Sequence, residues 1–148
     1  MIVVLPGMQW FISLGGRKVQ PVVNLFYKYL KEGKIMGFQC SRCGIILFPP
    51  QGLCSNCGSN DFSWIPMSGR GKLKFASVGP HRMMGIQFIQ GTVRLEEGPW
   101  VSGMLLDESF DLSRPERILE YNGADINVVM EVVKNPEGVE AVAFRIVR

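Results

Sequence analysis

The feature that most constrains this 148-residue chain is a pair of matched cysteine motifs. One motif is Cys40-Ser41-Arg42-Cys43-Gly44 and the other is Cys54-Ser55-Asn56-Cys57-Gly58, and together they hold all four cysteines of the sequence. Two residues between cysteines allow both thiolates of a motif to bind one ion at the tip of a tight turn. Four such thiolates match the tetrahedral preference of Zn²⁺, and the glycine after each second cysteine suits the turn. The pattern predicts a zinc ribbon.

Other uses of these cysteines fit the sequence less well. Two disulfides would need an oxidising compartment, and we expect no secretory signal in this sequence. A thioredoxin-like redox motif would use one such pair near a strand–helix–strand unit. A catalytic zinc would keep one position for water, and the single histidine, His81, lies outside the ribbon. We therefore expect one structural Zn²⁺ per chain, held by Cys40, Cys43, Cys54 and Cys57.

The composition indicates a globular protein, because 47% of the residues are hydrophobic and 20% are charged. The net charge of +3 is mild, so it permits a nucleic-acid partner without favouring one. We expect residues 1–20 to be an apolar tail, of which residues 1–16 carry no charge. Pro6 and Gly7 interrupt this uncharged stretch, which is shorter than the roughly 20 residues that a helix needs to cross a bilayer. We expect a cytoplasmic protein without a membrane span.

Hydrophobic periodicity predicts a helix over residues 21–35, followed by the ribbon over residues 36–67. Val22, Phe26 and Tyr29 belong to an aromatic and aliphatic stripe on one helix face, and Gly33 is a plausible stop. Between the cysteine motifs, Phe48-Pro49-Pro50 prevents a regular strand, because proline donates no ladder hydrogen bond. The segment Ser68-Gly69-Arg70-Gly71 is predicted to be a hinge into a second domain over residues 68–148.

This second domain contains five stretches with the two-residue period of strands. They cover residues 72–78, 84–95, 100–106, 126–133 and 139–147, and they place Phe75 and Phe88 on the apolar face. Ser113 and Glu116 have the spacing of a capping box, which predicts a short helix after the third strand. Five strands with a helix after the third is the element order of an OB-fold barrel. The predicted fold class is mainly β, with an N-terminal helix, a rubredoxin-like four-cysteine zinc ribbon and a C-terminal five-stranded OB-fold barrel.

The order of these features resembles a known family. The resemblance rests on residues 26–33, the four cysteines, residues 48–50, residues 68–71 and the stretch Val93-Arg94-Leu95-Glu96-Glu97-Gly98. It is to the acyl-CoA-associated OB-fold proteins with a rubredoxin-like zinc ribbon, long catalogued as domain of unknown function thirty-five. Gln51, Ser55 and the segment 80–84 depart from the usual family pattern.

The resemblance implies a non-catalytic accessory or scaffold protein of acyl-CoA metabolism, on a lipid or isoprenoid-precursor route. Such a protein would bind a thiolase-type enzyme that condenses or cleaves acyl-CoA and would assist acyl-CoA handling. The residues themselves agree that no catalytic site is evident. Glu96 and Glu97 are adjacent on a strand and point to opposite faces, and no phosphate-binding glycine loop occurs.

If acyl-CoA contacts this chain, its phosphates would need nearby cations. Arg70, Lys72, Lys74 and Arg82 bracket the first barrel strands and are the candidate contacts for CoA or another anion. The simpler interpretation is a solvated basic strand face, which is the default for surface charges.

A single-stranded nucleic-acid-binding protein is the alternative function. Zinc ribbons and OB-folds both occur in such proteins, and they bind through aromatic platforms along a basic groove. Phe75, Phe88, Trp100 and Lys74 could form such a surface, although Phe75 and Phe88 fall on the apolar phase of their strands.

Overall fold

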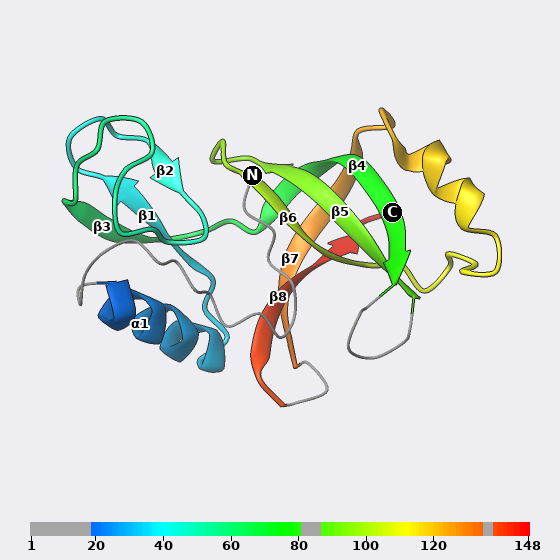
Figure 1. Cartoon of the computed structure of the whole chain (residues 1–148), viewed down its shortest axis with the longest axis horizontal. Helices are drawn as coiled ribbons and strands as arrows, with labels where there is room; N and C mark the ends of the chain where they lie inside the picture. Colours follow the sequence, from blue (N-terminus) through cyan, green and yellow to red (C-terminus); the bar gives the residue numbers. More distant parts are fainter. Residues whose placement is uncertain (1–18, 81–86, 135–137) are drawn as a thin grey trace.

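The computed structural model describes residues 19–80, 87–134 and 138–148, and its elements follow the predicted order (Figure 1). Helix α1 (Val19–Lys31) precedes a ribbon sheet of β1 (Met36–Cys40), β2 (Ile46–Leu47) and β3 (Phe62–Pro66). The barrel consists of β4 (Arg70–Pro80), β5 (Gln87–Leu95), β6 (Trp100–Leu106), β7 (Ile126–Lys134) and β8 (Glu140–Ile146), with the 3₁₀ helix η1 (Pro115–Tyr121) between β6 and β7. The ribbon and the barrel lie at opposite ends of the long axis.

The strands β4 to β8 close into a barrel in the order β4-β5-β6-β8-β7. Neighbouring strands are antiparallel except β6 and β8, where Met104 to Leu106 pair in parallel with Ala143 to Arg145. Because the barrel is closed, each of these strands pairs with a neighbour on both sides over at least part of its length. With η1 after the third barrel strand, the topology confirms the predicted OB-fold.

A β-bulge in β4 changes which side chains face the core. Leu73 pairs with Val93 and Phe75 pairs with Thr92, so Lys74 is an extra residue in the ladder with β5. Leu73 is fully buried, whereas Phe75 is 60% exposed. The prediction that Phe75 lies on the core face is therefore wrong, because the extra residue shifts the two-residue period.

Strand β5 also runs in the phase opposite to the prediction. Ile89, Val93 and Leu95 are buried, and Phe88 lies half-buried on the alternate face. The expected core position of Phe88 is therefore wrong. The residues of 81–86 that suggested the predicted phase lie outside the described residues.

The predicted capping box does not form. The backbone amide and hydroxyl of Ser113 both donate to Asp111 Oδ1, at 2.9 and 2.6 Å. Arg114 stands at the N-cap of η1 without a side-chain capping bond, and Pro115 begins the helix. A serine that bonds to a nearby side chain favours a turn over a cap. The short helix after the third strand is confirmed, but its predicted capping is wrong.

Helix α1 begins at Val19 and ends at Lys31, before the predicted limit of residue 35. Gly33 has a φ of 76° and donates its amide to the Leu30 carbonyl at 2.9 Å, and the next amide donates to the Tyr29 carbonyl at 2.9 Å. This pair of bonds is a Schellman motif, so the predicted stop at Gly33 is confirmed. Among the described helices, none is long and apolar enough to cross a membrane.

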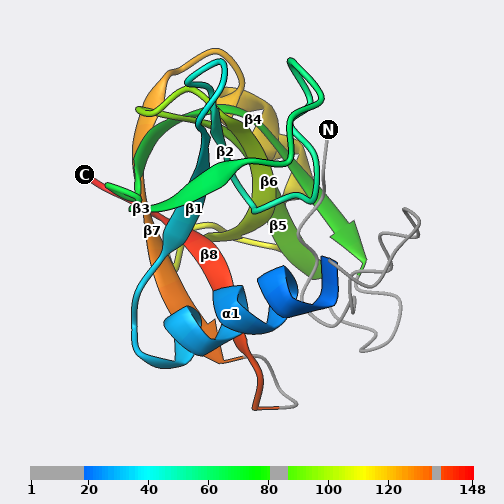
Figure 2. The ribbon, with the colours of Figure 1, turned by 90° about the vertical axis from the view of Figure 1, so that its left-hand side faces the viewer.

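The helix, the ribbon and the barrel share a hydrophobic core. Phe26 and Leu30 of α1 pack with Phe48 of the ribbon and with barrel side chains in a single buried cluster. The Phe26 and Phe48 rings meet edge to face at 5.8 Å, and Tyr29 meets Trp64 in the same way at 5.3 Å. Figure 2 shows α1 beside β8, with which it is in contact. The aromatic stripe of the helix is therefore a packing face.

The link between ribbon and barrel is held by hydrogen bonds. Ser68 donates its amide to Glu97 Oε1 at 2.5 Å, and the Gly69 carbonyl accepts from the Met130 amide at 2.6 Å. Strand β4 begins directly afterwards, at Arg70. The segment predicted to be a hinge is therefore bound to two barrel elements.

Asp107 joins the end of β6 to η1 and to the last residue of the chain. Its side chain is 4% exposed and accepts hydrogen bonds from Tyr121, from Ser109 Oγ at 2.6 Å and from Arg148 at 3.2 Å. Burial acts to raise the pKa of Asp107, but the hydrogen bonds from Ser109 and Tyr121 and the charge of Arg148 hold it below its usual range. Burial and the hydrogen bond to Asp107 raise the pKa of Tyr121 to about 12.

A Gly71→Ala substitution should destabilise the barrel by about 1–3 kcal/mol, because overpacking a closed site costs that much. The added Cβ would lie 2.6 Å from Val93 Cγ1 and 2.7 Å from the Arg94 carbonyl oxygen. Gly79→Ala in the same strand is the matched control, since an added Cβ there meets nothing within 4 Å. Urea denaturation followed by circular dichroism measures both variants, and equal stability would contradict the close approach of β4 to β5.

An Asp107→Asn substitution should lower the free energy of unfolding at neutral pH and flatten its dependence on pH. A carboxyl with a depressed folded-state pKa stabilises the protein above its unfolded pKa of about 3.9 and loses that contribution as pH falls through the lower folded value. Wild type should therefore lose more stability than the variant in acid. Urea denaturation at a series of pH values tests this, with the exposed Asp61→Asn as control. Parallel curves for wild type and Asp107→Asn would refute the assigned role.

Candidate metal centre

Both cysteine motifs form the same turn at one end of the ribbon. Gly44 donates its amide to the Cys40 carbonyl, and Gly58 donates its amide to the Cys54 carbonyl, each at 2.9 Å. The two glycines have φ values of 76° and 74°, in the left-handed region that side chains with a Cβ disfavour. The glycines that follow the motifs are therefore required by the turns that bring each cysteine pair together.

The four sulfur atoms form a compact group, with all Sγ atoms within 4.8 Å of one another. The Sγ atoms of Cys40 and Cys57 are 3.6 Å apart, as are those of Cys43 and Cys54. These separations far exceed a disulfide bond of about 2.05 Å, and all four cysteines are free. They approach the edge of about 3.8 Å expected for a tetrahedron with metal–sulfur bonds of about 2.3 Å. The cysteines are thus positioned to hold one tetrahedral metal ion.

Amide hydrogens around the sulfurs supply further stabilisation for thiolates. The backbone amide of Ile45 and the side chain of Asn56 lower the pKa of Cys43 to about 6. The amide of Ser59 also acts to lower the pKa of Cys57, but burial and the other three thiols raise it to about 11. Crowded thiols therefore resist losing all their protons together, and a bound cation would remove that obstacle.

The site is closed and lies against the small core of the ribbon. Cys40 and Cys54 are buried with Phe38 and Leu47, and Phe38 stacks on Phe62 at 5.0 Å. In the described ranges, this is the only group of three or more His, Cys, Asp or Glu side chains placed to hold a metal ion. Four thiolates fill a tetrahedron and leave no position for water, so the chemistry of the donor set fits a structural ion.

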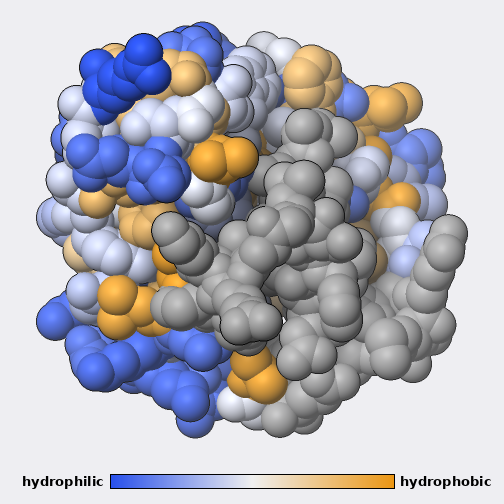
Figure 3. All heavy atoms as spheres, turned by 60° about the vertical axis from the view of Figure 1, so that its left-hand side comes forward, coloured by the Kyte–Doolittle hydropathy of each residue, from blue (hydrophilic) through white to orange (hydrophobic). Residues whose placement is uncertain are grey.

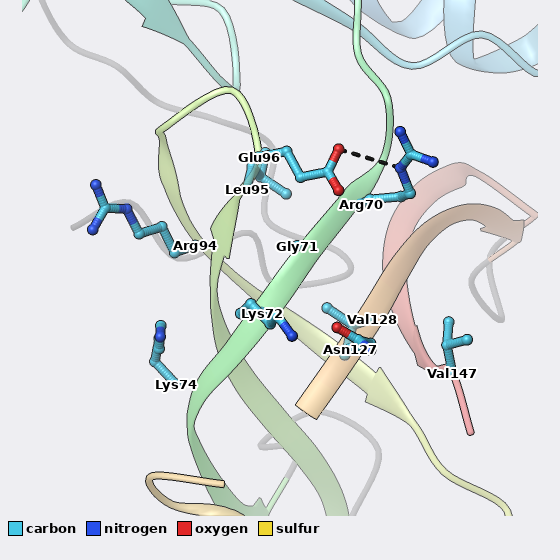
Figure 4. A pocket seen from close by; sticks show the side chains of 10 residues that line it. All are labelled: Arg70, Gly71, Lys72, Lys74, Arg94, Leu95, Glu96, Asn127, Val128 and Val147. Carbon is cyan, nitrogen blue, oxygen red and sulfur yellow. Dashed lines mark hydrogen bonds and ion pairs between the residues drawn. The ribbon is translucent and has the colours of Figure 1, made fainter. Parts of the chain in front are cut away.

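The candidate anion contacts gather at a second site, on the barrel. Arg70, Lys72 and Lys74 line a pocket of about 440 Å³ between β4, β5 and β7 (Figure 4). The fourth candidate, Arg82, lies outside the described residues. Arg94 of β5 lines the same pocket and was missed by the sequence reasoning. The sequence did contain a signal for Arg94: a charged residue between two apolar residues of a strand, Val93 and Leu95, is expected to point outward.

Strand register brings four side chains into one row on the outside of the barrel. Asn127 pairs with Lys72, Lys72 pairs with Arg94, and Arg94 pairs with Trp100, across β7, β4, β5 and β6. The Arg94 guanidinium lies 5.9 Å from the centre of the Trp100 ring, within the range of a cation–π contact. We call these four residues the basic row.

Comparison with known proteins finds relatives of the ribbon alone and of the ribbon together with the barrel. Residues 28–63 match the ChsH2 family of rubredoxin-like zinc ribbon domains. A DUF35 domain-containing scaffold protein of Methanocaldococcus jannaschii is 26% identical over 114 residues, covering 73% of this chain and 76% of that protein. A protein of the same name in Pyrococcus furiosus is 27% identical over 117 residues, covering 76% and 80%. The benzoylsuccinyl-CoA thiolase subunit BbsA of Thauera aromatica is 38% identical over 61 residues, covering 36% of this chain and 42% of that protein.

Two solved structures share the fold. The chain aligns with a chain of the Ltp2–ChsH2(DUF35) aldolase at a TM-score of 0.63 and 19% identity, covering 83% of this chain and 92% of that one. It aligns with a DUF35 protein of unknown function from Sulfolobus solfataricus at a TM-score of 0.56 and 13% identity, covering 86% of each. The protein is therefore of the class that joins a four-cysteine ribbon to an OB-fold barrel. Within that class it is related to the DUF35 proteins, and the resemblance predicted from the sequence is confirmed.

A Cys54→Ser substitution should remove most of the bound metal and lower the melting temperature of the protein strongly. Structural metal sites contribute on the order of 10 kcal/mol in small domains, and a missing thiolate leaves the tetrahedron incomplete. Elemental analysis of purified protein and thermal denaturation measure the two effects. The control is Ser55→Ala, an exposed position in the same turn. A metal-free variant that melts like wild type would contradict the structural role.

Proposed function

We propose that this protein is a non-catalytic accessory subunit that binds a thiolase-type enzyme of acyl-CoA metabolism and assists that enzyme in handling its acyl-CoA. The observation that carries the proposal is the kinship of a ribbon-plus-barrel chain with proteins named as scaffolds and as a thiolase subunit. The shared fold with a chain of the Ltp2–ChsH2(DUF35) aldolase supports an enzyme partner of the thiolase or aldolase kind.

The metal in this proposal is one Zn²⁺ per chain, held by Cys40, Cys43, Cys54 and Cys57. Support comes from the all-sulfur donor set, the tetrahedral spacing and the match to a zinc ribbon family. When bound, the ion would fix the two turns relative to each other. The amide and Asn56 contacts to the sulfurs would orient the ligands in the way that outer hydrogen bonds support other metal sites.

The carboxylates near the pocket between β4, β5 and β7 have structural roles, which supports a binding function without catalysis. Glu96 forms an ion pair with Arg70 at 3.2 Å, and Glu97 accepts the Ser68 amide. In the described part of the chain, every cysteine belongs to the metal group, so no thiol remains as a nucleophile. His81 lies outside the described residues.

The ribbon end offers a surface suited to a partner protein. Ile45 and Leu53 flank the cysteine turns and are 38% and 55% exposed, and Arg42 and Asn56 at the turn tips are also exposed. On the described part of the face in Figure 3, small apolar patches lie among hydrophilic side chains. Such a mixture is typical of interfaces between proteins that also exist separately.

Affinity purification of the tagged protein from its native organism, with nuclease treatment, tests the proposal. We expect a thiolase, synthase or aldolase in stoichiometric amount, identified by mass spectrometry. Leu53→Ser should reduce its recovery, because removing an exposed apolar side chain weakens an interface without disturbing a core. Leu119→Ser is the matched control, since Leu119 is 68% exposed on η1 at the barrel end. Recovery of no acyl-CoA enzyme would refute the accessory role.

A second candidate, single-stranded nucleic-acid binding, has one specific observation in its favour. Phe75 and Trp100 are 60% and 47% exposed on the barrel surface that carries the basic residues. Exposed aromatic rings near cations are the elements on which OB-folds stack bases. This function requires binding of single strands that weakens steeply with salt, and recovery of only nucleic-acid-processing proteins in the purification would favour it.

A further inference from the structure

We propose that the pocket at the basic row binds the phosphorylated adenosine end of coenzyme A and leaves the pantetheine arm and the thioester outside the barrel, for the partner enzyme. The inference rests on the proposed function, since it takes the acyl-CoA from there and assigns one part of that molecule to one surface of this chain.

The observation that carries the inference is a pair of like charges. Lys72 and Arg94 are directly opposite each other in the antiparallel pair of β4 and β5, and both are exposed. Like charges in this position destabilise a sheet. The neighbour of Lys72 on its other side is the neutral Asn127, so the row contains no carboxylate. An anion between Lys72 and Arg94 would turn this repulsion into two charge-assisted contacts.

The other cations of the pocket already have partners. Arg70 forms an ion pair with Glu96, and Lys74 forms one with Asp125. Within the described ranges, neither Lys72 nor Arg94 forms an ion pair within 4 Å, and the charge of Lys72 acts only as a secondary influence on Asp125, after that of Lys74. Their charges are therefore the ones available to a ligand, while Arg70 and Lys74 flank them and add to the positive potential.

The position of the tryptophan indicates what kind of anion the row would hold. The Trp100 ring follows Arg94 in the row and is 47% exposed. Neighbouring strands are about 4.8 Å apart, so Trp100, Arg94 and Lys72 follow one another across the sheet at about that spacing. A purine stacks on an aromatic ring, and phosphates bind cations. A phosphorylated adenosine has both groups next to each other.

The remaining lining suits binding and offers no chemistry on a thioester. Val147, which is 49% exposed, supplies apolar surface for a ribose, and the lining contains no cysteine, histidine or serine. The volume of about 440 Å³ falls in the range of about 300–1,000 Å³ found for small-molecule sites. Figure 4 shows Lys72 on β4 between Arg94 on β5 and Asn127 on β7. The reactive end of the molecule would therefore act elsewhere, on the partner.

Isothermal titration calorimetry on the full chain tests the site with five probes: CoA, ADP, pantetheine, inorganic pyrophosphate and a short single-stranded oligonucleotide. We expect CoA to bind and pantetheine not to bind. Lys72→Gln and Arg94→Gln should each weaken CoA binding about tenfold or more, because hydrogen bonds to charged groups contribute that much. Trp100→Leu should weaken CoA binding while leaving the response to inorganic pyrophosphate unchanged.

The matched control is Lys34→Gln, an exposed lysine that pairs with Glu32 before the ribbon. It should bind CoA as wild type does. A second readout separates a ligand-binding role from a structural one: Lys72→Gln should melt no lower than wild type, because it removes a repulsion. Lower stability together with unchanged CoA binding would overturn the inference.

Three other results would also overturn it: no CoA binding, binding of pantetheine as tight as that of CoA, or tighter binding of the oligonucleotide than of CoA. None of these depends on whether the enzyme partner co-purifies. Recovery of a thiolase-type enzyme by a chain that does not bind CoA would leave the accessory role standing without this site. CoA binding without an enzyme partner would refute the accessory role and keep the site.

Discussion

The convergence of four cysteine sulfurs at one point is the constraint on which the ribbon depends. Its three strands contain five, two and five residues, and its own buried cluster consists of Phe38, Cys40, Leu47 and Cys54. A unit with so few apolar contacts cannot offset the conformational entropy of its loops, and small units of this kind need a covalent or metal link. Two of the four cluster members, Cys40 and Cys54, belong to the group positioned to hold a metal ion, so a bound ion would stabilise the same turns that the packing does.

The ribbon is nevertheless not an independent body, because α1 joins it to the barrel. Phe26 of the helix contacts Phe48 of the ribbon within a cluster that includes Leu73, Val93 and Phe144 of the barrel. The hydrogen bonds of Ser68 and Gly69 hold the connecting segment on the other side. The two cysteine turns and the basic row are thus held by one connected structure. In the proposed function, such a framework would contact an enzyme with one end and a nucleotide with the other.

How far the fold could be predicted differs from element to element. The strand alternation found β6 with its observed limits, and the family resemblance and helix position supported the OB-fold. The same alternation wrongly placed Phe75 in the core. The cause is a one-residue bulge at Lys74, which residue types and their spacing do not reveal. The Ser113 capping box failed for a related reason, since Asp111 offers that serine an alternative hydrogen bond. Patterns predict elements well where one local requirement dominates and less well where two side chains compete.

The sequence by itself determined the four cysteines positioned for a metal ion, the two glycine turns and the order of the elements. Each of these depends on contacts between residues close in the chain, which spacing and residue type describe directly. Only the tertiary structure decided that Lys72, Arg94, Trp100 and Asn127 form one row, because that depends on the register of four strands. Register follows from the burial of the inner side chains and from the bulge in β4, which are long-range consequences of closing the barrel.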